Sequence, residues 1–179
     1  MQHFKYVFGL FLAISLLTAC KKDGSNDSST TAGNTPVEAA AQGSYATPVL
    51  PNPSKPKVQL LLRSPYWVAE YWVNHADNSQ NEANKGRWWA LKDDGTFTTG
   101  QWENTYSSGS WVVYNDGPKD LLHLDAADDR LDMEFELQAV SSMEDYMSWS
   151  GTKTYGMSRI AVKAIALLSM PTKVQFGVQ

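Results

Sequence analysis

The stretch Arg87–Asn115, RWWALKDDGTFTTGQWENTYSSGSWVVYN, decides the fold class of this 179-residue chain. It alternates aromatic and β-branched runs with short polar clusters, a pattern typical of β-strands separated by turns. The Asp-Gly pair in its first polar cluster indicates a tight hairpin, because glycine supplies the positive φ that such a turn needs. The predicted elements are strands at Arg87–Lys92, Thr96–Glu103 and Ser110–Asn115, with turns at Asp93–Gly95 and Asn104–Gly109. A β-meander therefore stands at the centre of the sequence.

Further strands are predicted on both sides of this meander. Short apolar or alternating runs bounded by turn residues indicate them. They cover Tyr66–His75, Asp120–Asp125, Arg130–Val140 and, as a last edge strand, Pro171–Gln179.

Other segments leave the type of element open. Val58–Arg63 fits a strand or a short helix that plugs one end of a barrel. Tyr155–Leu168 fits a helix or a strand, and its β-branched residues favour the strand. Ser141–Trp149 fits a loop that enters a short strand, and Ala76–Gly86 is a long polar loop.

Alternation along the strands predicts which side chains face the core. Arg130–Val140 has the clearest period of two, which indicates one core face and one face in water. Its predicted core face holds Met133, Phe135, Leu137 and Ala139, and its water face holds Asp132, Glu134, Glu136 and Gln138. In Tyr66–His75, one face holds Trp67, Ala69, Tyr71 and Val73, and the other holds Val68, Glu70 and Trp72. Phe97 and Trp102 both face the core only if Gly100 marks a β-bulge.

These patterns predict an all-β domain. About eight to ten short antiparallel strands with regular turns form either a sandwich or a small up-and-down barrel. The nearly sequential hairpins favour the barrel, because a meander closes on itself without crossing connections. Val58–Gln179 provides 122 residues, enough for one hydrophobic core and too few for two. We therefore expect a single β-barrel domain there.

The first twenty residues predict export and a lipid anchor. Val7–Leu17 is an unbroken apolar run, too short to span a bilayer and typical of a signal peptide, which we assign to residues 1–19. Leu17-Thr18-Ala19-Cys20 resembles the lipobox of bacterial lipoprotein signal peptides at every position. The resemblance implies that Cys20 carries a diacylglycerol and an acylated amine, which anchor the protein stably in the outer membrane. Whether it faces the periplasm or the cell exterior stays undetermined. A secreted protein with a chance cysteine is the alternative.

Residues 20–57 predict a disordered linker, since small and polar residues and proline dominate them. Lys21-Lys22-Asp23 resembles in part the export signals of surface lipoproteins from Bacteroidota-type bacteria, and is equally well a soluble start of a linker. The domain that follows carries 10 Lys+Arg against 16 Asp+Glu. This acidic balance argues against nucleic acid as a partner and against charge-driven binding to anionic head groups. The membrane is expected as a partner through the lipid alone.

Three motifs resemble a known family. Asp94-Gly95-Thr96-Phe97, Gly109-Ser110-Trp111 and Leu122-His123-Leu124 are similar to a progression found in lipocalin-like domains of Bacteroidota lipoproteins. The resemblance covers about the middle third of the chain and implies a barrel that holds a small ligand. Ser64-Pro65-Tyr66-Trp67 stands where lipocalins carry a first-strand Gly-x-Trp. This departure leaves open whether the interior holds a ligand or only side chains.

Polar residues predict neither a catalytic nor a metal site. The candidates are the turn carboxylates Asp93 and Asp94, the cluster Asp125, Asp128 and Asp129, the pair Glu134 and Glu136, and the histidines His75 and His123. The aspartate cluster lacks a calcium-binding loop pattern, and the histidines lack zinc-site spacing. No nucleophile elbow, phosphate-binding glycine loop or dinucleotide fingerprint is present in the sequence. We therefore expect a non-enzyme without a cofactor, unless distant residues assemble a site.

Aromatic residues are the stronger lead. We expect Trp89, Phe97, Trp111 and Phe135 in the core. The others exceed what a small barrel can pack, so the candidate ligand-binding residues are Trp67, Trp72, Trp88, Trp102, Tyr106 and Trp149, with Tyr66 beside them. One hypothesis is a small apolar or aromatic ligand in the barrel mouth, which requires an internal cavity. The other is an envelope interaction or glycan-binding module, which requires a filled interior and outward aromatics.

Overall fold

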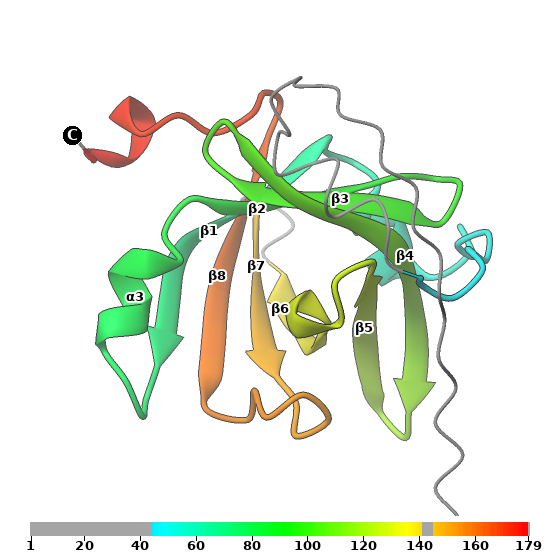
Figure 1. The fold of residues 1–179 in the computed structure, drawn as a ribbon. Coiled ribbons are helices and arrows are strands. Elements are labelled where there is room, and N and C mark those ends of the chain that lie inside the picture. The colour runs from blue at the N-terminus through cyan, green and yellow to red at the C-terminus, as the bar shows by residue number, and fades with distance from the viewer. Residues whose placement is uncertain (1–43, 141–144, 179) are drawn as a thin grey trace, which may run out of the picture. The chain divides into compact units, whose positions relative to one another are not determined.

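The computed structural model describes residues 44–140 and 145–178. They form eight β-strands with short helical segments between them (Figure 1). The strands are β1 (Tyr66–Asn74), β2 (Arg87–Leu91), β3 (Thr96–Gln101), β4 (Asn104–Asp116), β5 (Lys119–Ala126), β6 (Met133–Val140), β7 (Tyr146–Gly151) and β8 (Ile160–Leu167). The helical segments are α2 (Pro56–Leu61), α3 (Ser79–Ala83) and the 3-10 turns η1 (Asp129–Leu131) and η2 (Val174–Phe176).

Every strand pairs antiparallel with the next one in the chain, and β8 closes the barrel against β1. The closing register runs from Tyr66 opposite Leu167 to Asn74 opposite Ile160. The predicted all-β, up-and-down barrel is therefore confirmed, and its strand number lies at the lower end of the expected range. The strand prediction for Tyr155–Leu168 is also confirmed in its second half, as β8.

The central meander forms as predicted except at its second turn. Gly95 adopts φ +83° in the first hairpin, where the Thr96 amide and hydroxyl donate to Asp94 Oδ1. The predicted turn at Asn104–Gly109 is wrong, because these residues begin the long strand β4. Polar Thr and Ser residues are compatible with a strand when the neighbouring strands on both sides provide hydrogen-bond partners for its backbone.

A β-bulge occurs where Gly100 predicts one. Thr99 pairs with Ser107 and Gly100 with Thr105, so Tyr106 is the extra residue in the ladder. The bulge does not bring Trp102 into the interior, however. Trp102 lies in the turn after β3 at φ 52°, and its ring packs edge-on against Phe176 at 5.5 Å.

A second bulge overturns the predicted faces of β1. Ala69 pairs with Ala164 but Tyr71 pairs with Lys163, so the ladder shifts at Glu70. Trp67 and Ala69 face the core, and after the bulge Trp72 takes the place on that face that the alternation assigns to Tyr71. Tyr71 is 60% exposed. Because side chains alternate between the two faces of a strand, one unpaired residue moves every later side chain of the strand to the opposite face.

Two predictions outside the barrel wall are also corrected. The polar segment Ala76–Gly86 contains the short helix α3 rather than a continuous loop. Pro171–Gln179 forms η2 and no strand in its described part, up to residue 178. Since β1 and β8 already pair with each other, the closed barrel offers no free edge for another strand.

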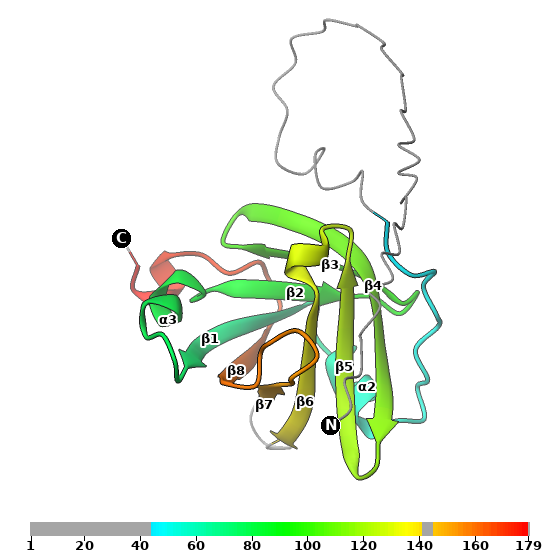
Figure 2. The same cartoon turned by 60° about the horizontal axis from the view of Figure 1, so that its bottom comes forward.

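Helix α2 covers one end of the barrel, which we call the helix end. Pro56 fits the first helical position, and Val58 and Leu61 are buried in the core. The indole N–H of Trp67 donates to the Leu61 carbonyl at 2.8 Å. Of the two predictions left open for Val58–Arg63, the plugging helix is the one observed (Figure 2).

The described part of the predicted linker, residues 44–57, contacts the barrel. The Ala46 amide donates to Asp125 Oδ2 at 2.9 Å, and Lys55 Nζ donates to the Val113 carbonyl at 3.1 Å. A Cβ on Gly95 would lie 2.3 Å from the Val49 carbonyl oxygen, so only glycine admits this crossing. The contacts of the barrel domain therefore begin before the predicted boundary at Val58.

The opposite end of the barrel, which we call the loop end, carries the β1–β2, β3–β4, β5–β6 and β7–β8 connections. Met157, from the β7–β8 connection, packs into the core there. Met133, Phe135 and Leu137 of β6 face the core as predicted, and the side chain of Ala139 lies outside the described set.

Candidate binding site in the barrel interior

All seven tryptophans are buried, with exposed fractions from 0% to 7%. The excess of aromatics predicts that some of them line a cavity mouth or stand on the surface, and the tryptophans among them do not stand on the surface. The barrel buries aromatics in two places. Most of the tryptophans lie in the interior. Trp88 and Trp102 are buried outside the core cluster, on the outer wall near the β3–β4 hairpin. Two layers of burial accommodate more aromatics than a single core.

Three of the six predicted ligand-binding residues meet in the interior. Trp72, Trp149 and Trp67 form one cluster with Phe135 and Trp89. Phe135 lies at its centre, with ring centroids 6.5 Å from Trp72, 6.0 Å from Trp89 and 5.4 Å from Trp149. The other three, Trp88, Trp102 and Tyr106, are not brought into this cluster. The interior is thus lined by aromatic rings in mutual contact.

Arg87 is the functional candidate that the sequence analysis missed. It begins β2 at the loop end, in the same phase as the core residues Trp89 and Leu91, and it is only 9% exposed. Its guanidinium carbon lies 6.0 Å from the Trp72 ring and 5.8 Å from the Trp89 ring. The signal was available, because Arg87 occupies a core position in an alternating strand.

The charge of Arg87 has no carboxylate partner among the described residues. Nη1 donates weakly to Asn84 Oδ1 at 3.4 Å, whereas Nε and Nη2 are buried without any partner in the described chain. Burial lowers the pKa of Arg87 to about 10, so the guanidinium stays charged at neutral pH. A buried, unpaired cation is costly, and such groups concentrate at functional sites.

Two interior indoles share this property. Trp72 Nε1 and Trp149 Nε1 are buried with no acceptor in the described part of the protein. Other indoles are satisfied, as Trp67 shows by donating to the Leu61 carbonyl and Trp111 by donating to the Lys92 carbonyl. The interior therefore presents several unpaired donors, and it would bind a group that accepts hydrogen bonds.

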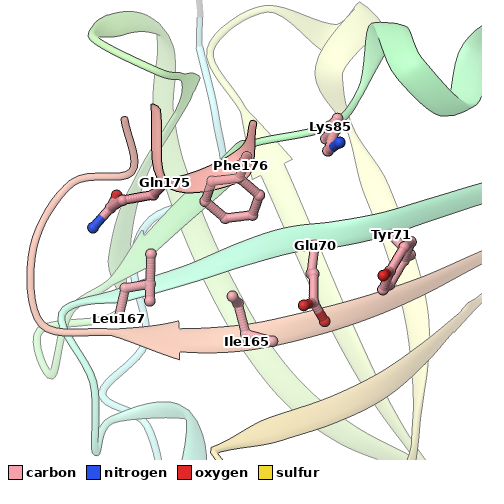
Figure 3. Close-up of a pocket in the computed structure, with 7 residues that line it drawn as sticks. All are labelled: Glu70, Tyr71, Lys85, Ile165, Leu167, Gln175 and Phe176. Carbon is pink, nitrogen blue, oxygen red and sulfur yellow. The ribbon is translucent and has the colours of Figure 1, made fainter. Parts of the chain in front are cut away.

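A second candidate is an outer groove of about 310 Å³ between the barrel wall and the C-terminal segment (Figure 3). Its lining residues are Glu70, Tyr71, Lys85, Ile165, Leu167, Gln175 and Phe176. Beside it, Lys163 Nζ forms an ion pair with Glu70 Oε2 at 2.6 Å, and this contact raises the pKa of Lys163. Lys163 also lies 5.7 Å from the ring centre of Tyr71 and 5.1 Å from that of Tyr146.

On the outer wall, Glu134 corrects another prediction. It alternates with core residues as expected, yet it is 4% exposed instead of facing water. Its carboxylate accepts hydrogen bonds from the hydroxyls of Tyr114 at 2.5 Å, Thr152 at 2.6 Å and Thr154 at 2.5 Å. Burial raises the pKa of Glu134, but these hydrogen bonds outweigh burial and leave it lowered. A carboxylate bound to three donors is a poor proton acceptor.

The surroundings of Glu134 give no catalytic arrangement. His123 Nδ1 lies 3.8 Å from Glu134 Oε2, and the His123 ring packs on Tyr155 at 5.7 Å. A surface hollow of about 410 Å³ adjoins Glu134 and is lined also by Lys119 and Lys153. Glu136 pairs there with Lys119 at 2.7 Å. The polar groups of this wall pair with one another, and their arrangement among the described residues gives no positive indication of enzymatic chemistry.

Three of the remaining candidate carboxylates have structural partners. Asp125 accepts the Ala46 amide, and Asp128 pairs with Arg130. Asp94 caps its hairpin turn. Among residues 44–140 and 145–178, no group of three or more His, Cys, Asp or Glu side chains is placed to hold a metal ion.

Some predictions lie outside the described residues, among them the signal peptide and the lipid attachment at Cys20. Within the described ranges, no helix is long and apolar enough to cross a membrane. The observed class is a closed, eight-stranded, antiparallel up-and-down β-barrel with an aromatic interior and a buried arginine. No family model, no curated protein and no solved structure matches the chain.

Proposed function

We propose that this protein is a lipid-anchored protein of the bacterial outer membrane whose barrel binds a small apolar or aromatic ligand. The lipid anchor rests on the resemblance of Leu17–Cys20 to a lipobox. Ligand binding rests on one observation, the unpaired indole donors of Trp72 and Trp149 in an aromatic interior. Small-molecule sites are mostly apolar and aromatic, with a few polar groups that orient the ligand.

The loop end is the entrance in this proposal, because α2 covers the helix end. Met157 reaches into the core from the β7–β8 connection and is the side chain that gives way to a ligand. Methionine suits this role, since its flexible, polarizable side chain adapts to changes in packing. The ligand packs its apolar body on the rings around Phe135 and presents an acceptor to the indole N–H groups.

Native mass spectrometry tests this function most directly. The protein is isolated from the envelope of its host, and its mass is compared before and after denaturation. We expect a small molecule that is lost on denaturation. A bare protein, still bare after incubation with a lipid extract of the host, would overturn the proposed binding for those lipids.

A second candidate function belongs to a different class, an interaction or glycan-binding module. The groove in Figure 3 favours it, because the apolar residues Phe176 and Leu167 line the same groove as the exposed Tyr71. Mixed aromatic and polar surfaces of this kind occur at recognition sites. Tyr71→Ala is the test variant, and Tyr155→Ala, which removes another exposed tyrosine far along the sequence, is the control. Selective loss of glycan or partner binding in Tyr71→Ala supports this function, and equal binding by both variants overturns it.

A further inference from the structure

We infer that the ligand of the barrel carries a carboxylate, and that Arg87 binds this carboxylate from the inner wall. The inference rests on the proposed function and adds the chemical class of the ligand. Arg87 is the only buried arginine among the described residues.

The free edge of the guanidinium has the geometry for a carboxylate. Nη1 faces Asn84, whereas Nε and Nη2 have no partner in the described chain. Nε–H and Nη2–H are the two parallel donors on one edge of an arginine side chain. This edge matches the two oxygens of a carboxylate in a bidentate pair. The unpaired atoms of Arg87 are therefore the pair that a carboxylate uses.

The surroundings of Arg87 supply no competing anion. None of the ion pairs between described residues includes Arg87. Its neighbours include the rings of Trp72 and Trp89, the Asn84 amide and the Tyr106 phenol, and none of these is a carboxylate. Contacts between a cation and aromatic rings offset only part of the cost of removing a charge from water. A ligand carboxylate would neutralise the charge where no side chain does.

The number of charges favours a monoanion with an apolar body. One buried cation balances one negative charge, so a doubly charged phosphate would leave a net charge in the interior. The rings of Trp72, Trp89 and Phe135 favour an apolar or aromatic remainder. The unpaired indole N–H of Trp72, whose ring lies 6.0 Å from the guanidinium carbon, offers a further donor to the acid oxygens. A fatty acid or an aryl-alkyl acid has this combination.

The test compares acids with alcohols of the same skeleton. Binding of decanoate and decanol, and of phenylbutyrate and phenylbutanol, is measured on the full mature protein by tryptophan fluorescence and by calorimetry. We expect the acid of at least one pair to bind at least about tenfold more tightly than its alcohol, as a charge-assisted bidentate contact requires. Arg87→Met removes this preference. Arg159→Met, which changes an exposed arginine, retains it.

The outcomes separate the inference from the proposed function. If acid and alcohol bind equally well, the barrel binds ligands but Arg87 does not select an acid, and the inference alone is overturned. If no member of either pair binds, the proposed function and the inference fail together for these ligand classes.

Thermal stability distinguishes a binding role from a structural one. If Arg87 serves the ligand, Arg87→Met melts at the same or a higher temperature than the unliganded wild type, because an apolar side chain replaces an unpaired charge. A lower melting temperature together with an unchanged acid preference shows a structural role and overturns the inference. If Arg87→Met does not fold, Arg87→Lys keeps the charge without the two-donor edge, and its acid preference is expected to fall severalfold.

Discussion

The inner and outer walls of this barrel differ in whether their buried charged groups have hydrogen-bond partners among the described residues. On the outer wall, Glu134 is a buried carboxylate that receives three hydroxyl hydrogen bonds. On the inner wall, Arg87 is a buried cation with two unpaired nitrogens. Folding alone explains the first, since a satisfied polar network stabilises and orients its elements. It does not explain the second, whereas a ligand bound in the interior would pair with these nitrogens.

Truncation at the centre of the inner wall should have the largest effect on stability. Phe135 is fully buried and contacts Trp72, Trp89 and Trp149. Phe135→Ala removes these contacts and leaves a cavity, so the free energy of unfolding should fall by about 3 to 5 kcal/mol. Urea denaturation followed by tryptophan fluorescence measures this change. Phe176→Ala, on the outer surface, is the control, and an equal loss in both variants would contradict the central role of Phe135.

Removing the outer carboxylate should have the next largest effect. Glu134→Ala leaves the hydroxyls of Tyr114, Thr152 and Thr154 without their acceptor, at a cost of about 2 to 3 kcal/mol in the free energy of unfolding. Glu136→Ala removes only a partly exposed ion pair with Lys119 and should cost less than about 1 kcal/mol. Chemical denaturation of both variants decides this. Similar losses in the two would show that Glu134 contributes no more than a surface charge.

The same carboxylate predicts an acid dependence. The pKa of Glu134 is lowered in the folded protein from its ordinary value of 4.5. The folded state therefore binds this proton less readily than the unfolded state, and the stabilisation is present above pH 4.5 and lost as the pH falls below it. Melting temperatures between neutral and acid pH should fall more steeply in the wild type than in Glu134→Gln. Parallel curves would refute this assignment.

Two interior tryptophans give a smaller and more direct test of the comparison. Trp67 donates to the Leu61 carbonyl, whereas Trp72 has no acceptor among the described residues. Replacement by phenylalanine removes the indole N–H in each case. Trp67→Phe should lower the free energy of unfolding by about 1 kcal/mol more than Trp72→Phe, because only the former breaks a hydrogen bond. The opposite order in denaturation experiments would show that the Trp72 indole is satisfied after all.

The smallest expected effect is at alkaline pH. The hydrogen bond to Glu134 raises the pKa of Tyr114 from 10.0 to about 12. A raised pKa means that the folded state holds this proton more firmly, so its stabilisation is complete below pH 10 and is lost between pH 10 and 12. Tyr114→Phe should lack this part of the alkaline loss. Tyr71→Phe, at a tyrosine that is 60% exposed, is the control, and the tyrosine absorbance near the transition identifies the group that titrates.

Local patterns predicted the wall of the barrel well. The Asp-Gly turn and the strand β8 are confirmed, and so is the core face of Arg130–Val140 within β6, because each depends on neighbours in sequence. The predicted water face of β6 is wrong at Glu134, which is buried. Predictions that assumed an unbroken alternation were less reliable. The faces of β1 exchange at Glu70, since a bulge is set by the pairing with β8 and not by β1 itself.

The candidate site was predicted only in part. The excess of aromatics indicates Trp67, Trp72 and Trp149 among the candidates, and the fold brings these three together while it buries Trp88 and Trp102 elsewhere. Arg87 carried a signal, a charge in phase with Trp89 and Leu91, that an alternation analysis centred on apolar residues passes over. For Glu134 the sequence contains no signal of burial, because its position in the alternation is that of a water-facing residue.

The sequence by itself determined the strands, most of their turns and the all-β class, because turn chemistry and a period of two act over a few residues. Only the tertiary structure decided which buried polar groups are satisfied. Glu134 receives its donors from β4 and from the residues that follow β7, whereas no element within residues 44–140 and 145–178 brings a carboxylate to Arg87. Hydrogen bonds of this kind join residues that are distant in sequence, so they exist only once the barrel has closed.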